Sequence, residues 1–279
     1  MKIYIPTFRR VDNQITFNNL PDDVKENVIL VVQEQEKNQY KYDCEYLVVG
    51  DNIGIAKTRE HIYRHAGKNR FGMLDDDVRF YRRNTMYYKG EESNMEKSRR
   101  MMNQDDWKDW FNVLNELLDN EDMMHIGNRD NSLPPKLIRF YYHQLIIATH
   151  WIDGSKLHNF IDEVDWNLVQ VGEDNVLSLE CAMRGYKNAI SDEFLMTRWE
   201  TAFAKGGCSD FRTVDFNEQE HMKLVKKYPF VTMTNEFYEW KRIGRMRRFN
   251  VDIKGAYNSH NLSTLDKFMT WQMLLNSLI

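Results

Sequence analysis

Cysteine is scarce in this chain of 279 residues, and the three that occur, Cys44, Cys181 and Cys208, lie far apart. An odd number at such spacing indicates neither a disulfide framework nor a metal-binding cluster, so we expect a reducing, cytoplasmic location. Long apolar runs are also missing: no stretch reaches about 18 residues, and the apolar start Met1–Pro6 is too short for a signal peptide. We therefore expect neither secretion nor a membrane-spanning segment.

Glycine-rich phosphate loops are missing as well, since neither G-x-G-x-x-G nor G-x-x-x-x-G-K-[ST] follows the first apolar run. There is no basic excess: 38 Lys and Arg stand against 42 Asp and Glu, for a formal net charge of −4. This balance argues against a basic coat over the whole surface but leaves room for a local basic groove. Hydrophobic residues make up 42% of the chain, enough for the core of one large α/β domain or of a domain with an appendage.

Apolar runs alternate with helical patterns in the first 80 residues. Strands are predicted at 2–6, 28–32, 46–49 and 71–74, with a helix at 54–66 that Gly67 ends. This alternation is typical of a parallel, Rossmann-like sheet. Later patterns predict helices at 104–120, 173–184, 217–228 and 265–279, strands at 140–147, 186–190 and 194–199, and a tight turn at Asp153-Gly154.

Three consecutive carboxylates, Asp75, Asp76 and Asp77, follow the predicted strand at 71–74. Adjacent acids repel one another by a few kcal/mol unless a cation lies between them, and hard divalent metals prefer carboxylate oxygens. A polar turn after a strand is the alternative interpretation. After the first strand come Thr7, Arg9 and Arg10, a hydroxyl and two guanidinium groups that suit a nucleotide diphosphate or, alternatively, a solvated loop.

A second acidic pair, Glu173-Asp174, opens a predicted helix that Gly185 closes. Acids at a helix N-terminus are favoured by the helix dipole, which is a complete structural explanation. The functional alternative is a general base that deprotonates an acceptor hydroxyl. Asn128 and Arg129 lie in a candidate substrate loop, with a turn rich in Asn and Asp as the alternative, and the loop at 205–213 offers Ser209 and Arg212 for phosphates. A basic, aromatic stretch with Arg245, Arg247 and Arg248 suits phosphodiesters or, alternatively, forms a charged helical face.

The order of these segments resembles the first half of GT-A glycosyltransferases, enzymes that use nucleotide sugars and a DxD motif. The resemblance rests on Tyr4-Ile5-Pro6-Thr7-Phe8-Arg9, then Gly54-Ile55-Ala56-Lys57-Thr58-Arg59, then Phe71-Gly72-Met73-Leu74-Asp75-Asp76-Asp77. It implies that Asp75 lies near the nucleotide, that Asp77 binds Mn²⁺ or Mg²⁺, and that Arg59 lies over the nucleotide. Asp76 would then turn toward the sugar or the protein. His221 is implied as a third metal ligand, with a surface histidine as the alternative.

Residues 171–187, with Gly172-Glu173-Asp174 and Gly185-Tyr186, resemble the G-E-D pattern of the same enzymes. The resemblance implies that one acid of the pair is the base or an acceptor clamp, and we favour Asp174 as the base over Glu173. Gly206-Gly207-Cys208-Ser209 with Arg212 resembles the TET-associated glycosyltransferases of phages, which decorate modified bases in DNA. The implied nucleotide-sugar site comprises Thr7, Arg9, Arg10, Arg59, Asp75, Asp76, Ser209 and Arg212.

The resemblance predicts an α/β fold of GT-A type, a Rossmann-like, mostly parallel central sheet flanked by helices. The catalytic core would span 1–215, with a nucleotide-binding half at 1–80 and an acceptor half at 121–215, and a helical segment at 216–279 would pack on it. The implied activity is metal-dependent transfer of a glucose- or arabinose-type sugar from a UDP-sugar to 5-hydroxymethylcytosine in phage DNA, by a monomer or homodimer in the host cytoplasm.

Three alternatives remain open. The acceptor of the same enzyme could be a glycan, a small molecule or a protein. A nucleotidyltransferase also uses clustered acids and metals, although the missing glycine-rich lysine loop and the Glu173-Asp174 pair count against it. A non-catalytic nucleic-acid-binding module built on the basic C-terminal segment would leave both acidic motifs without a role.

Overall fold

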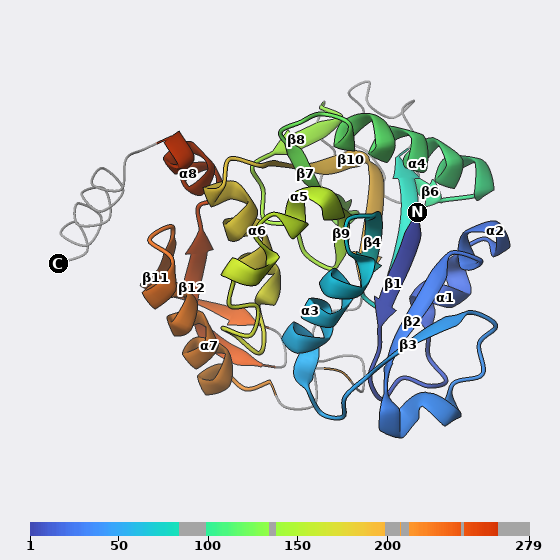
Figure 1. Ribbon diagram of the computed structural model, residues 1–279. Coiled ribbons are helices and arrows are strands. Elements are labelled where there is room, and N and C mark those ends of the chain that lie inside the picture. Colours follow the sequence, from blue (N-terminus) through green and yellow to red (C-terminus); the bar gives the residue numbers. More distant parts are fainter. Residues whose placement is uncertain (84–98, 134–137, 199–206, 208–211, 241–242, 262–279) are drawn as a thin grey trace.

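The computed structural model describes residues 1–83, 99–133, 138–198, 207, 212–240 and 243–261. Within them runs a ten-stranded sheet (Figure 1). Its first four neighbours are parallel: β3 (Glu45–Val49), β2 (Val28–Gln33), β1 (Lys2–Pro6) and β4 (Arg70–Leu74). Beyond β4 follow β9 (Thr149–Asp153), β7 (Met123–Asp130), β10 (Lys187–Arg198), β5 (Val78–Arg83) and β6 (Arg99–Met101), while β8 (Phe140–Tyr142) pairs with β10. Only β9, β5 and β8 run against the others, which confirms the mostly parallel sheet.

Helices cover both faces of the sheet. One face carries α3 (Gly54–Ala66), α5 (Gly154–His158) and α6 (Glu173–Met183), and the other α1 (Ile15–Asn19), α2 (Asp22–Lys25) and α4 (Gln104–Leu118). Strand β1 shows why the sheet lies between two layers, because Ile3 and Ile5 enter one core and Tyr4 the other. Each large apolar side chain buried in this way contributes about 1.5–3 kcal/mol.

The helix predictions at α3 and α4 are confirmed, and local chemistry explains where these helices end and begin. Gly67 has a positive φ (58°), which favours glycine, and its N–H donates to the Tyr63 carbonyl at 3.2 Å. At the start of α4, Asn103 and Asp106 form a reciprocal capping box, in which each side chain accepts from the backbone N–H of the other.

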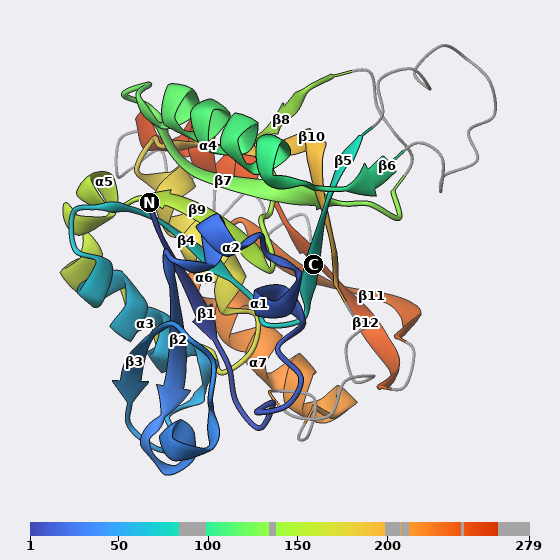
Figure 2. The same cartoon turned by 90° about the vertical axis from the view of Figure 1, so that its right-hand side faces the viewer.

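The C-terminal segment departs from the helical prediction. Among the described residues it comprises α7 (Val214–Lys227), a hairpin of β11 (Val231–Trp240) and β12 (Gly244–Val251), and the short α8 (Ile253–Asn258). The charged stretch at 236–249 therefore belongs, in its described part, to a two-stranded antiparallel ribbon, in which Phe237 lies opposite Arg247 and Glu239 opposite Arg245. Figure 2 shows α4 at one end of the molecule and α7 with this hairpin at the other. The helix predicted at 265–279 lies outside the described residues.

Three further strand and turn predictions change. The strand predicted at 140–147 ends after Tyr142, where His143 turns into the left-handed region (φ 55°). The strands at 186–190 and 194–199 are one long strand, β10, with a register irregularity between Ser191 and Leu195. Asp153-Gly154 begins α5 rather than a tight turn, because the Asp153 carboxylate accepts from the Ser155 N–H at 3.0 Å.

Shorter 3-10 segments complete the described elements: η1 (Glu34–Gln39), η3 (Ile161–Glu163) and η5 (Ser259–Asn261). In the described ranges, we find no helix whose length and apolar character would let it cross a membrane.

Candidate active site

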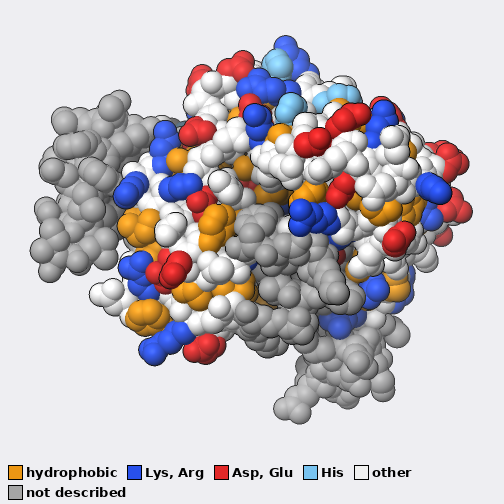
Figure 3. Space-filling view, turned by 90° about the horizontal axis from the view of Figure 1, so that it is seen from below, with side chains coloured by type: hydrophobic (Ala, Val, Ile, Leu, Met, Phe, Trp, Pro, Cys, Tyr) orange, Lys and Arg blue, Asp and Glu red, His pale blue; other side chains and the backbone are white. Residues whose placement is uncertain are grey.

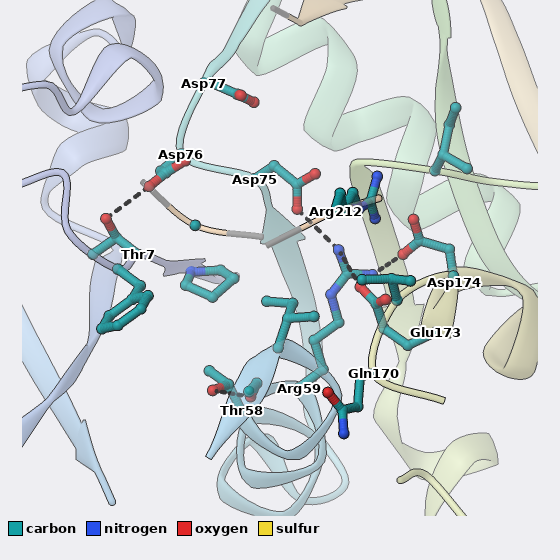
Figure 4. Close-up of a pocket in the computed structure, with 18 of the residues that line it drawn as sticks. Thr7, Thr58, Arg59, Asp75, Asp76, Asp77, Gln170, Glu173, Asp174 and Arg212 are labelled. Atoms are coloured by element: carbon teal, nitrogen blue, oxygen red, sulfur yellow. Dashed lines mark hydrogen bonds and ion pairs between the residues drawn. The ribbon is translucent and has the colours of Figure 1, made fainter. Parts of the chain in front are cut away.

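A cavity of about 570 Å³ opens beyond the carboxyl ends of β1 and β4, where the first turns of α3 and α6 and the side of α7 converge (Figure 4). Ligands of open α/β sheets bind at such strand ends. Its walls bring together most of the residues singled out from the sequence, namely Thr7, Arg9, Arg10, Arg59, Asp75, Asp76, Asp77, Glu173, Asp174, Arg212 and His221.

A single buried guanidinium, that of Arg59 in α3, joins the two acidic motifs. Arg59 is only 3% exposed. Its Nη2 lies 2.9 Å from Asp75 at the end of β4 and 3.3 Å from Glu173 in the first turn of α6, while Nη1 pairs with Asp174 (Figure 4). Carboxylates about a hundred positions apart in the chain thus face the same cavity. Arg59, expected over the nucleotide, also holds three acids in place.

The other two acids of the triplet are paired with Arg10. Asp76 is buried, accepts from the Thr7 hydroxyl at 2.7 Å and pairs with Arg10, whose Nη1 also lies 3.1 Å from Asp77. Burial raises the pKa of Asp76 to about 7, opposed by Arg10. Burial and repulsion from Asp75 raise the pKa of Asp77, again opposed by Arg10. Asp76 is therefore turned toward the protein, one of its two expected directions.

The loop after β1 is held in an uncommon conformation. Arg9 adopts the left-handed region (φ 56°), which costs a residue with a side chain on the order of 1 kcal/mol. Glu36 compensates, because its carboxylate accepts from the Arg9 backbone N–H at 3.0 Å. The N–H of Gly207, which belongs to the predicted glycine-rich segment, donates to the Phe8 carbonyl in this turn at 3.1 Å. Ser209 lies outside the described residues.

The cavity is closed by Arg212, which lies just before α7, and by His221 on the side of α7. Figure 4 shows Arg212 among the cavity-lining side chains, and its guanidinium lies 5.8 Å from the ring centre of Trp240. The His221 ring stacks on Phe249 at 4.1 Å. Burial and the charge of Arg212 lower the pKa of His221 to about 4, so its imidazole is neutral at pH 7. Within the described ranges, its Nδ1 has no hydrogen-bond partner.

Asn128 and Arg129 are not brought to this cavity. The Asn128 side chain is buried, accepting from Trp151 Nε1 at 2.9 Å and donating to the Phe194 carbonyl at 3.1 Å. Arg129 pairs with the buried Asp192 at 2.6 Å. Both side chains have structural partners, so their acceptor role stays a prediction without geometric support.

The three predicted DNA-binding arginines lie on the hairpin. Arg245 stacks over Phe237 at 4.7 Å, Arg247 pairs with Glu218 of α7 at 2.9 Å, and Arg248 pairs with Glu236 at 3.2 Å. Strand alternation puts Arg248 on the face opposite Arg245 and Arg247, so the sequence cluster is divided. Figure 3 shows basic and hydrophobic side chains intermixed on the left of the lower face, the side on which the hairpin lies.

Sequence reasoning missed several residues of the site. The cavity is also lined by Thr58, Gln170, Asn175, Arg198, Asn217 and Trp240. Thr58 lies within the Gly54–Arg59 motif and Asn175 directly follows the Glu173-Asp174 pair, so these two motifs could have indicated both residues. His150 had no such signal: it belongs to β9, which no pattern predicted, yet its Nε2 lies 2.9 Å from Asp174.

Comparison with known proteins gives one family and a distant structural likeness. The family model described as TET-Associated Glycosyltransferase matches residues 1–207. No curated protein matches the chain. Among solved structures, the mannosyltransferase PcManGT from Pyrobaculum calidifontis, in complex with GDP-Man and Mn²⁺, is similar over 99% of this chain and 74% of its own, with 12% identity and a TM-score of 0.43.

Proposed function

We propose that this chain, which belongs to the TET-associated glycosyltransferase family, transfers a glucose- or arabinose-type sugar from a UDP-sugar to the hydroxyl of 5-hydroxymethylcytosine in DNA. The observation that carries the proposal is Arg59, which joins Asp75 to Glu173 and Asp174 on the wall of one cavity. A donor-binding acid and a candidate base therefore face the same space, as transfer between two substrates requires.

The donor would occupy the end of the cavity nearest β1 and β4. A volume of about 570 Å³ falls in the range of small-molecule sites. Arg9, Arg10 and Arg212 supply guanidinium groups for the diphosphate, and Asp75, whose side chain is 32% exposed, can accept from a nucleotide hydroxyl. The hydrogen bond from the Thr7 hydroxyl to Asp76 ties the loop after β1 to the residues that follow β4.

The acids fit a divalent cation in donor chemistry. Asp75 and Asp77 carry the hard oxygens that Mg²⁺ and Mn²⁺ prefer, and their mutual repulsion contributes to the raised pKa of Asp77. His221 adds a neutral nitrogen on the same wall. The described residues contain no group of three such side chains close enough to hold a metal by themselves. Magnesium sites of this kind use one or two carboxylates and complete the shell with substrate phosphates and water.

A cation held there would neutralise charge on the departing diphosphate. The protein's own contribution is Asp174. Its carboxylate is 17% exposed and pairs with Arg59, a cation that favours the ionised form a base must have. Asp174 would take the proton of the acceptor hydroxyl while the hydroxyl oxygen bonds to the sugar carbon. The bond from that carbon to the diphosphate would break in the same step.

The hairpin β11–β12 supports DNA as the acceptor. The major groove admits a two-stranded ribbon, and the substituent at C5 of a pyrimidine projects into that groove. Phe237 and Tyr238 are exposed on this hairpin, by 49% and 36%, and Arg245 lies over Phe237. Trp240 of the same ribbon lines the cavity. The ribbon therefore connects the candidate DNA surface directly to the candidate catalytic site.

The activity is tested with radiolabelled UDP-glucose and UDP-arabinose, Mn²⁺ or EDTA, and matched duplexes with cytosine or 5-hydroxymethylcytosine. We expect label only in the modified duplex and only with metal. Asp174→Asn and Asp77→Ala should each lower transfer by at least about 100-fold. Asp122→Asn, an exposed acid paired with Lys187, is the matched control and should keep wild-type activity. Transfer to neither duplex, or equal transfer to both, would refute the proposed acceptor.

The DNA surface is tested separately by binding. Arg245→Glu should weaken duplex binding and reduce its salt dependence, because a phosphate contact releases counterions. Arg64→Glu reverses an exposed arginine on α3 and is the control for net charge alone. Equal effects of the two substitutions would show that the hairpin is not the footprint.

A further inference from the structure

Gln170 reaches the cavity from a short segment whose neighbouring side chains are buried. Val169 and Val171, on either side of it, are 0% and 1% exposed. Gln170 itself is exposed and is one of the residues that line the cavity (Figure 4). A buried anchor on each side thus leaves this polar side chain facing the site.

The backbone of Gln170 is held by a buried carboxylate of α7. Glu220 is 4% exposed; its Oε2 accepts from the Gln170 N–H at 2.5 Å, and its Oε1 accepts from Lys223 Nζ at 2.6 Å. A charge-assisted hydrogen bond of this kind restrains the point from which the side chain starts. Because the main chain makes this bond, a change of side chain at position 170 keeps it. α7 lies beyond residues 1–207, so this support comes from outside the part that the family model matches.

The segment that leads to Gln170 runs along α3 toward the start of that helix. Asp162 pairs with Arg64 at 2.7 Å, and the Asn167 amide donates to Glu60 at 2.7 Å, so the partners on α3 move toward its N-terminus as the segment advances. The first turns of α3 line the cavity at the carboxyl ends of the parallel strands, where we place the donor. Gln170 therefore lies on the donor side of the cavity.

The Gln170 carboxamide differs from the two amides that α6 and α7 contribute to the cavity. Asn175 donates to the Gly172 carbonyl at 2.7 Å, and Asn217 donates to the Thr213 carbonyl at 2.6 Å. Within the described ranges, the side chain of Gln170 has no hydrogen-bond partner. Its oxygen and its nitrogen are both available to a ligand.

A carboxamide donates and accepts at once, whereas the carboxylates of the cavity only accept and its guanidinium groups only donate. A vicinal pair of hydroxyls matches it, because one hydroxyl oxygen accepts from the amide N–H while the neighbouring O–H donates to the amide oxygen. We propose that Gln170 is a specificity-determining residue that binds a vicinal diol of the donor, on the ribose or on the transferred sugar. The inference rests on the proposed function, since it takes a nucleotide sugar as the ligand.

The test is calorimetric binding without acceptor, comparing wild type with Gln170→Met, which keeps the length of the side chain and removes both polar atoms. The ligands are UDP, 2′-deoxy-UDP, UDP-glucose and UDP-arabinose, each with Mn²⁺. If the ribose is bound, Gln170→Met should bind UDP and the UDP-sugars at least about 5-fold more weakly and lose the preference for UDP over 2′-deoxy-UDP. If the transferred sugar is bound, UDP affinity should stay unchanged, and affinity for the UDP-sugar that wild type prefers should fall by the same factor.

Unchanged affinity for all four ligands would overturn the proposal. A Gln170→Met enzyme whose defect is confined to the KM for the modified duplex would overturn it as well, because the residue would then serve the acceptor.

The control is Asn167→Leu, three positions earlier in the same segment. The Asn167 amide is exposed, does not line the cavity and donates to Glu60, so this variant should bind every ligand as wild type does. Equal losses in Asn167→Leu and Gln170→Met would assign the effect to a disturbed segment and refute the role of Gln170. Wild-type protein that binds none of the nucleotides would refute the proposed donor, and the inference would fall with it. Wild-type binding that Gln170→Met leaves intact refutes the inference alone.

Discussion

Replacing Arg59 with Met tests whether one guanidinium holds the site together. The substitution keeps the length of the side chain but leaves Asp75, Glu173 and Asp174 without a shared cation. Their side chains are only 32%, 10% and 17% exposed, so water compensates poorly. Removing one partner of a buried ion pair costs about 3–5 kcal/mol. For a chain of this size, that is a fall in Tm of roughly 6–20 °C.

The free energy of unfolding is measured by urea titration at pH 7. Mn²⁺ should restore stability to Arg59→Met if the acids can bind a cation. The control is Arg64→Met on the same helix, whose pairs with Glu60 and Asp162 are exposed and contribute about 1 kcal/mol at most. A loss at Arg59 within about 1 kcal/mol of this control would refute the reasoning.

Three further predictions concern stability. A Cβ added at Gly72 would lie 2.5 Å from the Trp151 ring, so Gly72→Ala should cost about 1–3 kcal/mol, and an unchanged Tm would contradict this packing. Tyr228→Phe removes the 2.6 Å hydrogen bond to the buried Glu180 and should cost about 1–3 kcal/mol in urea unfolding; no loss would show that bond to be dispensable. Burial lowers the pKa of His125 from 6.5 to about 3, so its contribution is complete above pH 6.5 and is lost as the pH falls toward 3; His125→Gln should flatten this part of the stability curve.

The predictable parts of the fold are those whose signal is local. β1, β2 and β4 are short apolar runs buried on both sides, and α3 begins and ends at glycines, so their bounds are nearly those predicted. Strand β9 gave no such signal, because His150 interrupts its apolar residues and is buried only through partners elsewhere in the chain. The hairpin gave no clear signal either, because its polar and apolar residues do not alternate regularly: Phe237 and Tyr238 are adjacent, as are Arg247 and Arg248.

The same contrast holds for the site. Motif order placed Asp75, Asp77, Glu173 and Asp174 in one cavity, and the structure does bring them there. Motif order does not show which charges neutralise which. Arg10 pairs with Asp76 and Asp77, and Arg59 pairs with Asp75 and Asp174. Residues predicted to bind the nucleotide, the metal or the acceptor proton therefore contact one another directly. Pairings of this kind depend on the distance between elements far apart in sequence, which no local pattern encodes.

These pairings explain how a cavity can hold five acids without collapsing or unfolding. Asp75, Asp76, Asp77, Glu173 and Asp174 share its wall with Arg9, Arg10, Arg59, Arg198 and Arg212, and the two sets balance in formal charge. Because the formal charges match, the arginines offset the repulsion among the acids within the wall of the cavity. A nucleoside diphosphate alone would upset that balance, whereas a diphosphate entering with a divalent cation disturbs it much less. For the proposed function, the arrangement of the arginines predicts that donor and metal bind together, through residues that the acidic motifs alone do not reveal.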